Sequence, residues 1–145
     1  MVAAAPPPPI VVTDPRGDSG TAPDITKVRV TTGAKGRIAF VVVFATPYGN
    51  NSSLYVYLGS QYRIGPGGLE VWDPPANDFE PLGSESGTFS VAPGGRALEV
   101  STTLAQVGNP KTLAVVVQSL DGDGGPGQVD TARLRWTHGP PGRSP

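Results

Sequence analysis

Short runs of alternating apolar and polar residues, separated by turns, are the feature that most constrains the fold of this chain. In the run 97–100 (Ala-Leu-Glu-Val) aliphatic residues alternate with a glutamate, and the run 88–91 (Thr-Phe-Ser-Val) alternates in the same way. Successive side chains of a β-strand point to opposite faces, so this pattern is typical of a strand with one buried face. The 20 glycines and 17 prolines among the 145 residues fall between such runs, where turns are expected.

Two runs are apolar on both faces and predict the strands at the centre of the fold. They are residues 38–45 (Ile-Ala-Phe-Val-Val-Val-Phe-Ala) and 113–117 (Leu-Ala-Val-Val-Val). A strand of this kind is covered on both faces or lies centrally in its sheet. The sequence holds about nine or ten short strands in all, which predicts an all-β fold, an antiparallel β-sandwich of jelly-roll-like topology. Segment 101–108 begins with hydroxyl residues and ends in glycine, and it predicts at most one short helical turn.

The length of the chain predicts one domain with a loose segment at each end. Residues 1–13 are rich in proline and predict a flexible arm in the extended polyproline II conformation. Residues 138–145 predict a flexible C-terminal tail, which leaves residues 14–137 for the β-sandwich domain. Two interpretations of the N-terminal segment stay open: it follows a removed signal peptide, or it is an ordinary disordered arm.

Composition and charge exclude several kinds of chemistry and partner. The chain has no cysteine, so it offers no disulfide, thiolate metal site or cysteine nucleophile. Its formal net charge of -1 and its lack of a basic run disfavour nucleic acid as a partner. The longest apolar run has only the length of a strand, so no membrane insertion is expected.

Catalysis is not expected from the residues present. The one histidine, His138, lies in the C-terminal tail, where it would not be held for a Ser-His-Asp triad or as a haem ligand. Glu70 and Asp73 are close enough in the sequence to form a carboxylate pair, but Glu70 alternates with apolar residues and is expected to face water. A glycosidase needs one of its two carboxylates buried with a raised pKa, so we predict that the protein is not an enzyme.

The tripeptide Arg16-Gly17-Asp18 matches the motif that integrins bind, and it lies in a predicted loop. Glycine and aspartate are also common turn residues, and in that interpretation the arginine is incidental. Loss of cell attachment on Asp18→Glu would distinguish adhesion from a simple turn.

The order of several short motifs resembles a group of exported bacterial β-sandwich modules that are common in actinobacteria. The motifs are Asp-Pro-Arg-Gly-Asp at 14–18, Asp-Ile-Thr at 24–26, Gly-Leu-Glu-Val-Trp-Asp at 68–73 and an acidic, glycine-rich loop at 121–127. The group is similar to DOMON-type domains and to carbohydrate-binding modules of family nine, and the resemblance covers residues 14–137. It implies a β-sandwich fold and a secreted or cell-envelope location. Many members carry Asp-Thr-Asp after the third strand, where this chain reads Tyr-Leu-Gly-Ser-Gln and lacks both carboxylates.

Aromatic side chains are the candidate ligand-binding groups. Tyr55 and Tyr57 share one face of their predicted strand, opposite three aliphatic residues, and are expected to point outward. With Tyr62 or Trp72 nearby, they could stack on a sugar ring, because rigid aromatic side chains supply apolar contact area at low entropic cost. The alternative is that these side chains stabilise the sheet and the core without any ligand.

Calcium is the candidate cofactor. Asp121 and Asp123 alternate with glycine, and Asp130 follows downstream. Calcium binds roughly six to eight oxygens, which such a loop can supply, although the glutamate that closes a helix-loop-helix site is missing. The alternative is that aspartate and glycine only form turns here. If the last strand pairs antiparallel with the first, Asp24 lies near Trp136, at the opposite end from Asp130.

Together these features predict a non-catalytic module, secreted or in the cell envelope, whose partner is a polysaccharide or cell-wall glycan. The alternative is a purely structural or protein–protein interaction domain of a surface assembly, with calcium as a stabilising ion. A concave aromatic face would favour the first function, and a flat hydrophilic face would favour the second.

Overall fold

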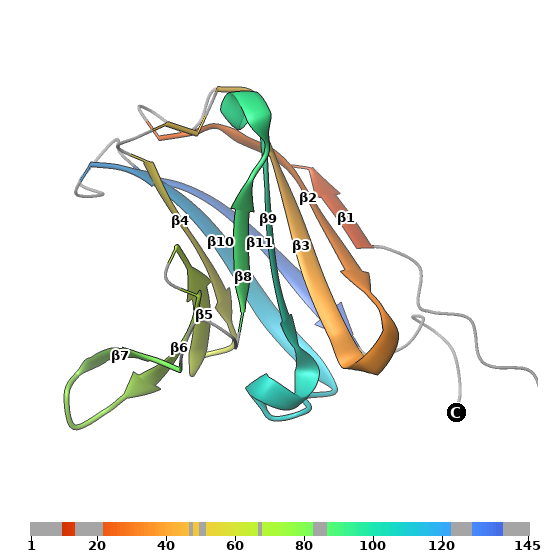
Figure 1. The fold of residues 1–145 in the computed structure, drawn as a ribbon, viewed down its shortest axis with the longest axis vertical. Helices are drawn as coiled ribbons and strands as arrows, with labels where there is room; N and C mark the ends of the chain where they lie inside the picture. Colours follow the sequence, from red (N-terminus) through yellow and green to blue (C-terminus); the bar gives the residue numbers. More distant parts are fainter. Residues whose placement is uncertain are drawn as a thin grey trace, which may run out of the picture.

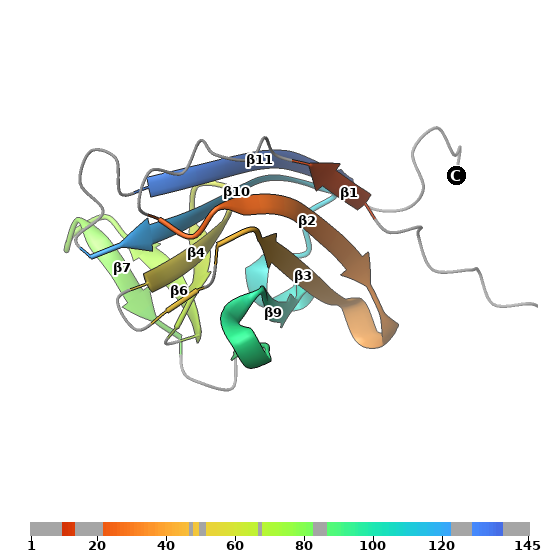
Figure 2. The ribbon, with the colours of Figure 1, turned by 90° about the horizontal axis from the view of Figure 1, so that it is seen from above.

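Two antiparallel β-sheets lie face to face in the computed structural model (Figures 1 and 2). The model describes residues 10–13, 22–46, 48–49, 52–66, 68–82, 87–122 and 129–137. Within these ranges the helical elements are short 3-10 turns: η1 (Ala34–Gly36), η2 (Pro93–Gly95) and η3 (Leu104–Val107). None of them is long and apolar enough to span a bilayer. The predicted all-β, antiparallel sandwich is therefore confirmed.

One sheet has five strands in the order β1-β2-β3-β9-β8, with every neighbouring pair antiparallel. The strands are β1 (Ile10–Thr13), β2 (Ile25–Thr32), β3 (Arg37–Phe44), β8 (Thr88–Val91) and β9 (Ala97–Thr103). β3 is the central strand, as its apolarity on both faces predicts. Its inner residues Phe40 and Val42 are fully buried, and Val41 on the outer face is half-buried.

β1 is an edge strand made of residues that the sequence assigns to the N-terminal arm. Ile10 pairs with Val30, and Val12 pairs with Val28. The side chain of Ile10 packs against the core, whereas Val11 points outward and is 52% exposed. The alternating exposure of β1 shows that apolar burial against β2, rather than a solvated polyproline conformation, fixes this part of the arm.

The other sheet has six strands in the order β11-β10-β4-β5-β6-β7, again with antiparallel neighbours. The strands are β4 (Ser52–Leu58), β5 (Tyr62–Gly65), β6 (Gly68–Asp73), β7 (Asp78–Pro81), β10 (Thr112–Asp121) and β11 (Val129–Thr137). The chain changes sheet after β3, after β7 and after β9. Figure 1 shows β7 at the lower left, beyond the strands of the five-stranded sheet.

The core lies between the sheets and takes its side chains from both. The largest fully buried side chains are Ile25, Val28, Val30, Ile38, Phe40, Val42, Leu54, Val56, Leu58, Ile64, Leu69 and Leu98. Removal of this apolar surface from water is the main stabilising contribution to a fold of this kind. The turn η3 adds Leu104 and Val107 to the core, within the segment that predicts a helical turn. Gly108 ends the turn with a positive φ of 87°, a conformation that glycine adopts without steric cost.

Candidate functional site

The outer face of β4 to β7 gathers an arginine and four aromatic side chains. Tyr55 and Tyr57 on β4 alternate with Leu54, Val56 and Leu58, which are buried between the sheets. This alternation turns both tyrosines outward, as the sequence predicts. The other members of the group are Arg63 on β5, Trp72 on β6 and Phe79 on β7. We call these five residues the aromatic cluster.

Strand register places the members of the aromatic cluster next to one another. Arg63 is the cross-strand partner of Tyr57 on one side and of Glu70 on the other. Trp72 is the partner of Phe79 in the hairpin of β6 and β7. Directly opposite residues on one face of a sheet lie within side-chain contact, so the pairing alone brings these groups together.

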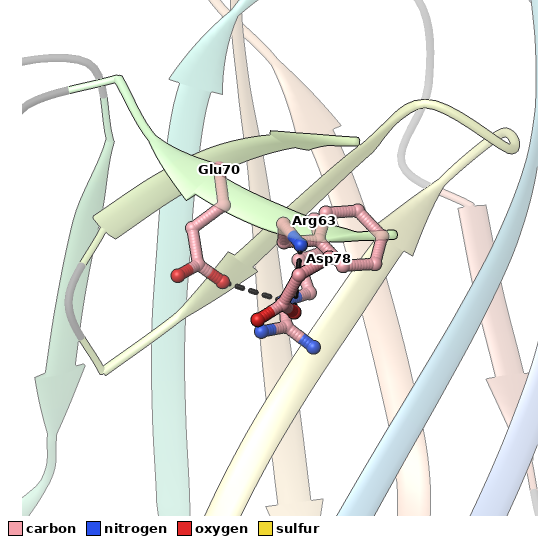
Figure 3. Close-up of polar contacts among 4 residues, drawn as sticks. Arg63, Glu70 and Asp78 are labelled. Carbon is pink, nitrogen blue, oxygen red and sulfur yellow. Dashed lines mark hydrogen bonds and ion pairs between the residues drawn. The ribbon is translucent and has the colours of Figure 1, made fainter. Parts of the chain in front are cut away.

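The guanidinium group of Arg63 lies between two aromatic rings. Its central carbon is 4.3 Å from the centroid of the Tyr55 ring and 4.3 Å from that of Phe79. Both distances are within the range of cation–π attraction. On the third side, the Nε atom donates a hydrogen bond to Oε1 of Glu70 at 2.5 Å (Figure 3). The Arg63 side chain is therefore held in one conformation by two rings and a carboxylate.

Burial and hydrogen bonding act in opposite directions on the charge of Arg63. Burial lowers the pKa of the guanidinium, whereas hydrogen bonds with Glu70 and Tyr57 and the charges of these groups raise it. The second effect is larger in sum, so the pKa of Arg63 is raised above its ordinary value. Arg63 and Glu70 are 19% and 20% exposed, so the ion pair is partly screened by water.

The rings of the cluster pack edge to face rather than as a flat platform. Trp72 and Phe79 have centroids 5.2 Å apart at an interplanar angle of 68°, and Tyr57 and Phe79 are 6.0 Å apart at 62°. Tyr55 and Tyr57 are 6.3 Å apart and tilted by 39°. Such arrangements are favoured by the ring quadrupoles. At the start of β7, the Asp78 carboxylate accepts the backbone N–H of Phe79 at 2.8 Å, which fixes the strand that carries this ring (Figure 3).

Gly65 makes room for the ring of Tyr55. A Cβ atom at Gly65 would lie 2.6 Å from Cε1 and 2.7 Å from Cδ1 of that ring, closer than real Cβ contacts. The opposite residue across the β5–β6 turn is Gly68, whose φ is 100°. The absence of a side chain at Gly65 leaves bare backbone, against which the ring of Tyr55 packs.

Tyr62 does not join the other predicted ligand-binding residues. It pairs with Leu58 and Val71, and its side chain packs against the core on the inner face of the sheet. Tyr55, Tyr57 and Trp72 are brought together on the outer face, whereas Tyr62 points to the opposite side. The other tryptophan, Trp136, is a core residue with 2% exposure.

Arg63 and Phe79 belong to the cluster but are not among the predicted site residues. Arg63 lies between Tyr62 and the buried Ile64, so the alternation of β5 carries a signal that would have placed it outward. Phe79 lies in a strand of four residues, which is too short for its alternation to indicate a direction. Its position becomes clear only from its pairing with Trp72.

Asp130, a predicted calcium ligand, links the two sheets along one side of the sandwich. The carboxylate is 2% exposed, and its Oδ2 atom accepts the backbone N–H of Ile25 at 2.8 Å. Oδ1 accepts the backbone N–H of Thr131 at 3.0 Å. Beside it, the Oγ of Ser119 donates to the carbonyl of Pro23 at 2.5 Å, and Ser119 pairs with Asp130 across β10 and β11.

The expectation that Asp24 and Asp130 lie at opposite ends is wrong. It assumes that the last strand pairs antiparallel with the first long strand, but β11 pairs with β10 and β2 belongs to the other sheet. β2 and β11 contact each other across one side of the sandwich, where Ile25 of β2 meets Asp130 of β11. The Asp24–Ile25 segment is therefore next to Asp130.

The calcium site stays a prediction. Asp121 is half-buried at the end of β10. The carboxylate of Asp130 accepts the backbone N–H of Ile25, and Asp123 lies outside the described residues. Among the residues that the structure does describe, no three carboxylates or other metal-binding side chains gather around one point. Calcium titration followed by the melting temperature tests the prediction, because an ion that binds only the folded state raises it.

Two further predicted features, the Arg16-Gly17-Asp18 motif and His138, lie outside the described residues. Comparison of the chain with protein-family models, with curated proteins and with solved structures finds no match. The resemblance to DOMON-type and family-nine carbohydrate-binding modules therefore stays a prediction that no comparison supports or opposes.

Proposed function

We propose that the protein is a non-catalytic binding module that holds a carbohydrate on the outer face of β4 to β7. The observation that carries this proposal is the aromatic cluster, in which several partly exposed rings and one arginine lie on a single face. Carbohydrate sites combine aromatic surface for the apolar face of a sugar with a few fixed polar groups for its hydroxyls.

The geometry divides the roles within the cluster. Arg63 covers the ring of Tyr55, so Tyr55 and Phe79 serve to hold the arginine in place. Tyr57 and Trp72 are half-buried, and we assign the stacking contacts with a sugar to them. Arg63 and Glu70 then supply a fixed donor and a fixed acceptor beside the rings. Because packing already holds these side chains, little conformational entropy is lost on binding.

The proposal includes no catalytic step. The carboxylate of Glu70 accepts a hydrogen bond from Arg63, and we assign it the role of an acceptor for a ligand hydroxyl. A secreted or cell-envelope location and a cell-wall glycan as the partner are part of the same proposal and derive from the resemblance of residues 14–137.

A structural role in a surface assembly is the second candidate function. The edge-to-face packing of the rings around Arg63 favours it, since such contacts stabilise a sheet without a ligand. Leu82, directly after β7, and Val91 on β8 are exposed apolar side chains, at 44% and 40%.

Binding of the purified protein to a panel of immobilised polysaccharides tests the proposal. We expect binding to at least one glycan and a loss of about tenfold in affinity for Trp72→Ala and for Tyr57→Ala. Val91→Ala, an exposed apolar residue of the other sheet, is the matched control and should bind as the unmodified protein does. Retention of the circular dichroism spectrum shows that each variant is folded. Failure to bind any glycan would favour the structural role.

A further inference from the structure

The outer face of the six-stranded sheet continues beyond the aromatic cluster onto β10 and β11, where it carries two arginines. Arg133 and Arg135 alternate with Ala132, Leu134 and Trp136 on β11, and these three residues pack toward the core. Both arginines are exposed. They therefore point to the same side of the sheet as Tyr57 and Arg63.

Strand register places Arg133 in one row with the aromatic cluster. Val116 on β10 pairs with Arg133 on one side and with Tyr57 on the other, and Tyr57 pairs with Arg63. The row thus runs across four neighbouring strands, β11, β10, β4 and β5, of which Figure 2 shows the first three side by side. Three steps between strands separate the backbones of Arg133 and Arg63 by roughly 14 Å.

The next row supplies uncharged polar groups beside the row of Arg133 and Tyr57. Gln118 on β10 pairs with Tyr55 on one side and with Thr131 on the other. The Gln118 amide and the Thr131 hydroxyl are 3.5 Å apart, and both residues are half-buried. Amide and hydroxyl groups at this position can donate to and accept from sugar hydroxyls.

On β10 and β11 the charged side chains of this face are Arg133 and Arg135, although the whole chain has a net charge of -1. Glu70 on β6 shares this face and is paired with Arg63, and Asp78 and Glu80 are exposed on the edge strand β7. Neither Arg133 nor Arg135 is held in a hydrogen bond or ion pair with another described residue. Arg133 therefore lies at one end of a row that begins at the aromatic cluster, and Arg135 lies two residues further along β11 on the same face.

We infer that the ligand of this face is an acidic polysaccharide, whose sugar rings stack on Tyr57 and Trp72 and whose carboxylates bind Arg133 and Arg135. The inference rests on the proposed carbohydrate-binding function and adds the charge of the ligand and its direction across the strands. Arginine suits this task because its planar guanidinium group binds a carboxylate through two parallel hydrogen bonds. A polysaccharide laid across the strands from β6 to β11 meets the rings first and the arginines last, with the Gln118 amide beside its path.

A nucleic acid is the other polyanion that pairs with aromatic and basic side chains. Proteins that bind single strands track many phosphates with a positively charged groove. Here two arginines lie beyond the rings and the chain as a whole is acidic, which favours a polymer with sparser charge that is rich in hydroxyls.

Affinity electrophoresis or calorimetry with polygalacturonate and with its fully methyl-esterified form tests the inference. The two polymers share the sugar backbone and differ in the carboxylate charge. The double variant Arg133→Gln/Arg135→Gln removes the positive charges from this face. Lys27→Gln/Arg29→Gln is the matched control, because both residues are exposed on β2, in the opposite sheet.

We expect binding to the acidic polymer that weakens with added salt and is about tenfold weaker for the esterified form. We also expect the β11 double variant to lose about five- to tenfold in affinity for the acidic polymer and the β2 control to lose none. A Trp72→Ala variant should lose affinity for both polymers.

Each contrary outcome contradicts a different part of the inference. Equal affinity for the two polymers would overturn the acidic ligand and leave the carbohydrate-binding function standing. Absence of binding to every polysaccharide in the panel would overturn the proposed function as well. Tighter binding to oligothymidylate than to polygalacturonate, reduced by the same arginine variant, would replace the glycan with a nucleic acid.

Discussion

The carboxylate of Asp130 accepts a hydrogen bond from the backbone N–H of Ile25, a residue 105 positions away in the sequence, at 2.8 Å. Ile25 is fully buried and Asp130 is 2% exposed, so water does not compete for either group. The contact joins the first residue of β2 to the second residue of β11, and these strands belong to different sheets. It therefore closes one side of the sandwich, where no backbone ladder connects the sheets.

Asp130→Ala should destabilise the protein by about 3 kcal/mol. The change leaves the backbone N–H groups of Ile25 and Thr131 without their acceptor. A buried donor without a partner lowers the free energy of unfolding by more than an intact hydrogen bond raises it. Asp130→Asn keeps one acceptor oxygen and should lose less. Urea unfolding at neutral pH measures both values. Glu99→Ala, on the exposed face of β9, is the control, and a similar loss there would contradict the specific role of Asp130.

Gly65→Ala should cost about 1–3 kcal/mol, since the new methyl group would overlap the ring of Tyr55 and push it away from Arg63. Gly49 has no heavy atom within 4 Å of its Cβ position, so Gly49→Ala is the matched control and should change stability little. Combination of Gly65→Ala with Tyr55→Ala removes the overlap. The double variant should therefore be more stable than the sum of the single changes predicts, and strict additivity would argue against the contact.

Arg63→Lys should destabilise the protein by about 1–2 kcal/mol while keeping the charge. A lysine ammonium group is not planar, so it cannot lie flat between the rings of Tyr55 and Phe79 and donate to Glu70 at the same time. Urea is the suitable denaturant, since guanidinium chloride screens the ion pair. Arg133→Lys, on the exposed face of β11, should change stability within about 0.5 kcal/mol.

Stability should fall in alkaline solution through Tyr48. Burial first, and then the charge of Tyr55, raise the pKa of Tyr48 above the ordinary value of 10.0. The unfolded chain therefore loses this proton at a lower pH than the folded protein does. The stabilisation is complete below the unfolded pKa and is lost as the pH rises through the folded pKa.

Comparison of Tyr48→Phe with the unmodified protein isolates this effect. The rings of Phe44 and Phe89 lie 6.0 and 6.2 Å from that of Tyr48, and phenylalanine keeps these contacts. Urea midpoints between about pH 9 and about pH 11 should fall less for Tyr48→Phe. Tyr62→Phe is the control for loss of a hydroxyl elsewhere. Parallel curves for Tyr48→Phe and the unmodified protein would contradict the assignment.

Local alternation was enough to predict the strands and the outward direction of Tyr55 and Tyr57, because side-chain period two depends only on neighbours in sequence. The same alternation places Tyr62 on the side of the buried Ile64, so the prediction of Tyr62 as a site residue, which relied on its proximity to Tyr57 in the sequence, went against the pattern of β5. The turn at Gly59, with φ of 68°, sets which residue of β5 faces Tyr57, and that residue is Arg63.

Long-range pairing accounts for the other errors of the sequence analysis. The position of Asp130 depends on which sheet each strand joins, and the local sequences of β2 and β11 do not specify their sheets. The same is true of β1, whose short apolar stretch becomes a strand only because Val28 and Val30 offer it an edge. The aromatic cluster likewise depends on the register of β4 with β5 and of β6 with β7.

The position of β6 and β7 beyond the five-stranded sheet has a consequence for local opening. The last four residues of β6 are only half-buried and β7 is mostly exposed, whereas β4 and β10 alternate with deeply buried residues. The outermost hairpin therefore depends on Arg63, Trp72 and Phe79 instead of the interior, and its amide protons should exchange with deuterium well before those of β10. Any molecule that settles on those rings would slow this exchange first, so mass-spectrometric deuterium uptake at 70–80 reports occupancy even when the ligand is unknown.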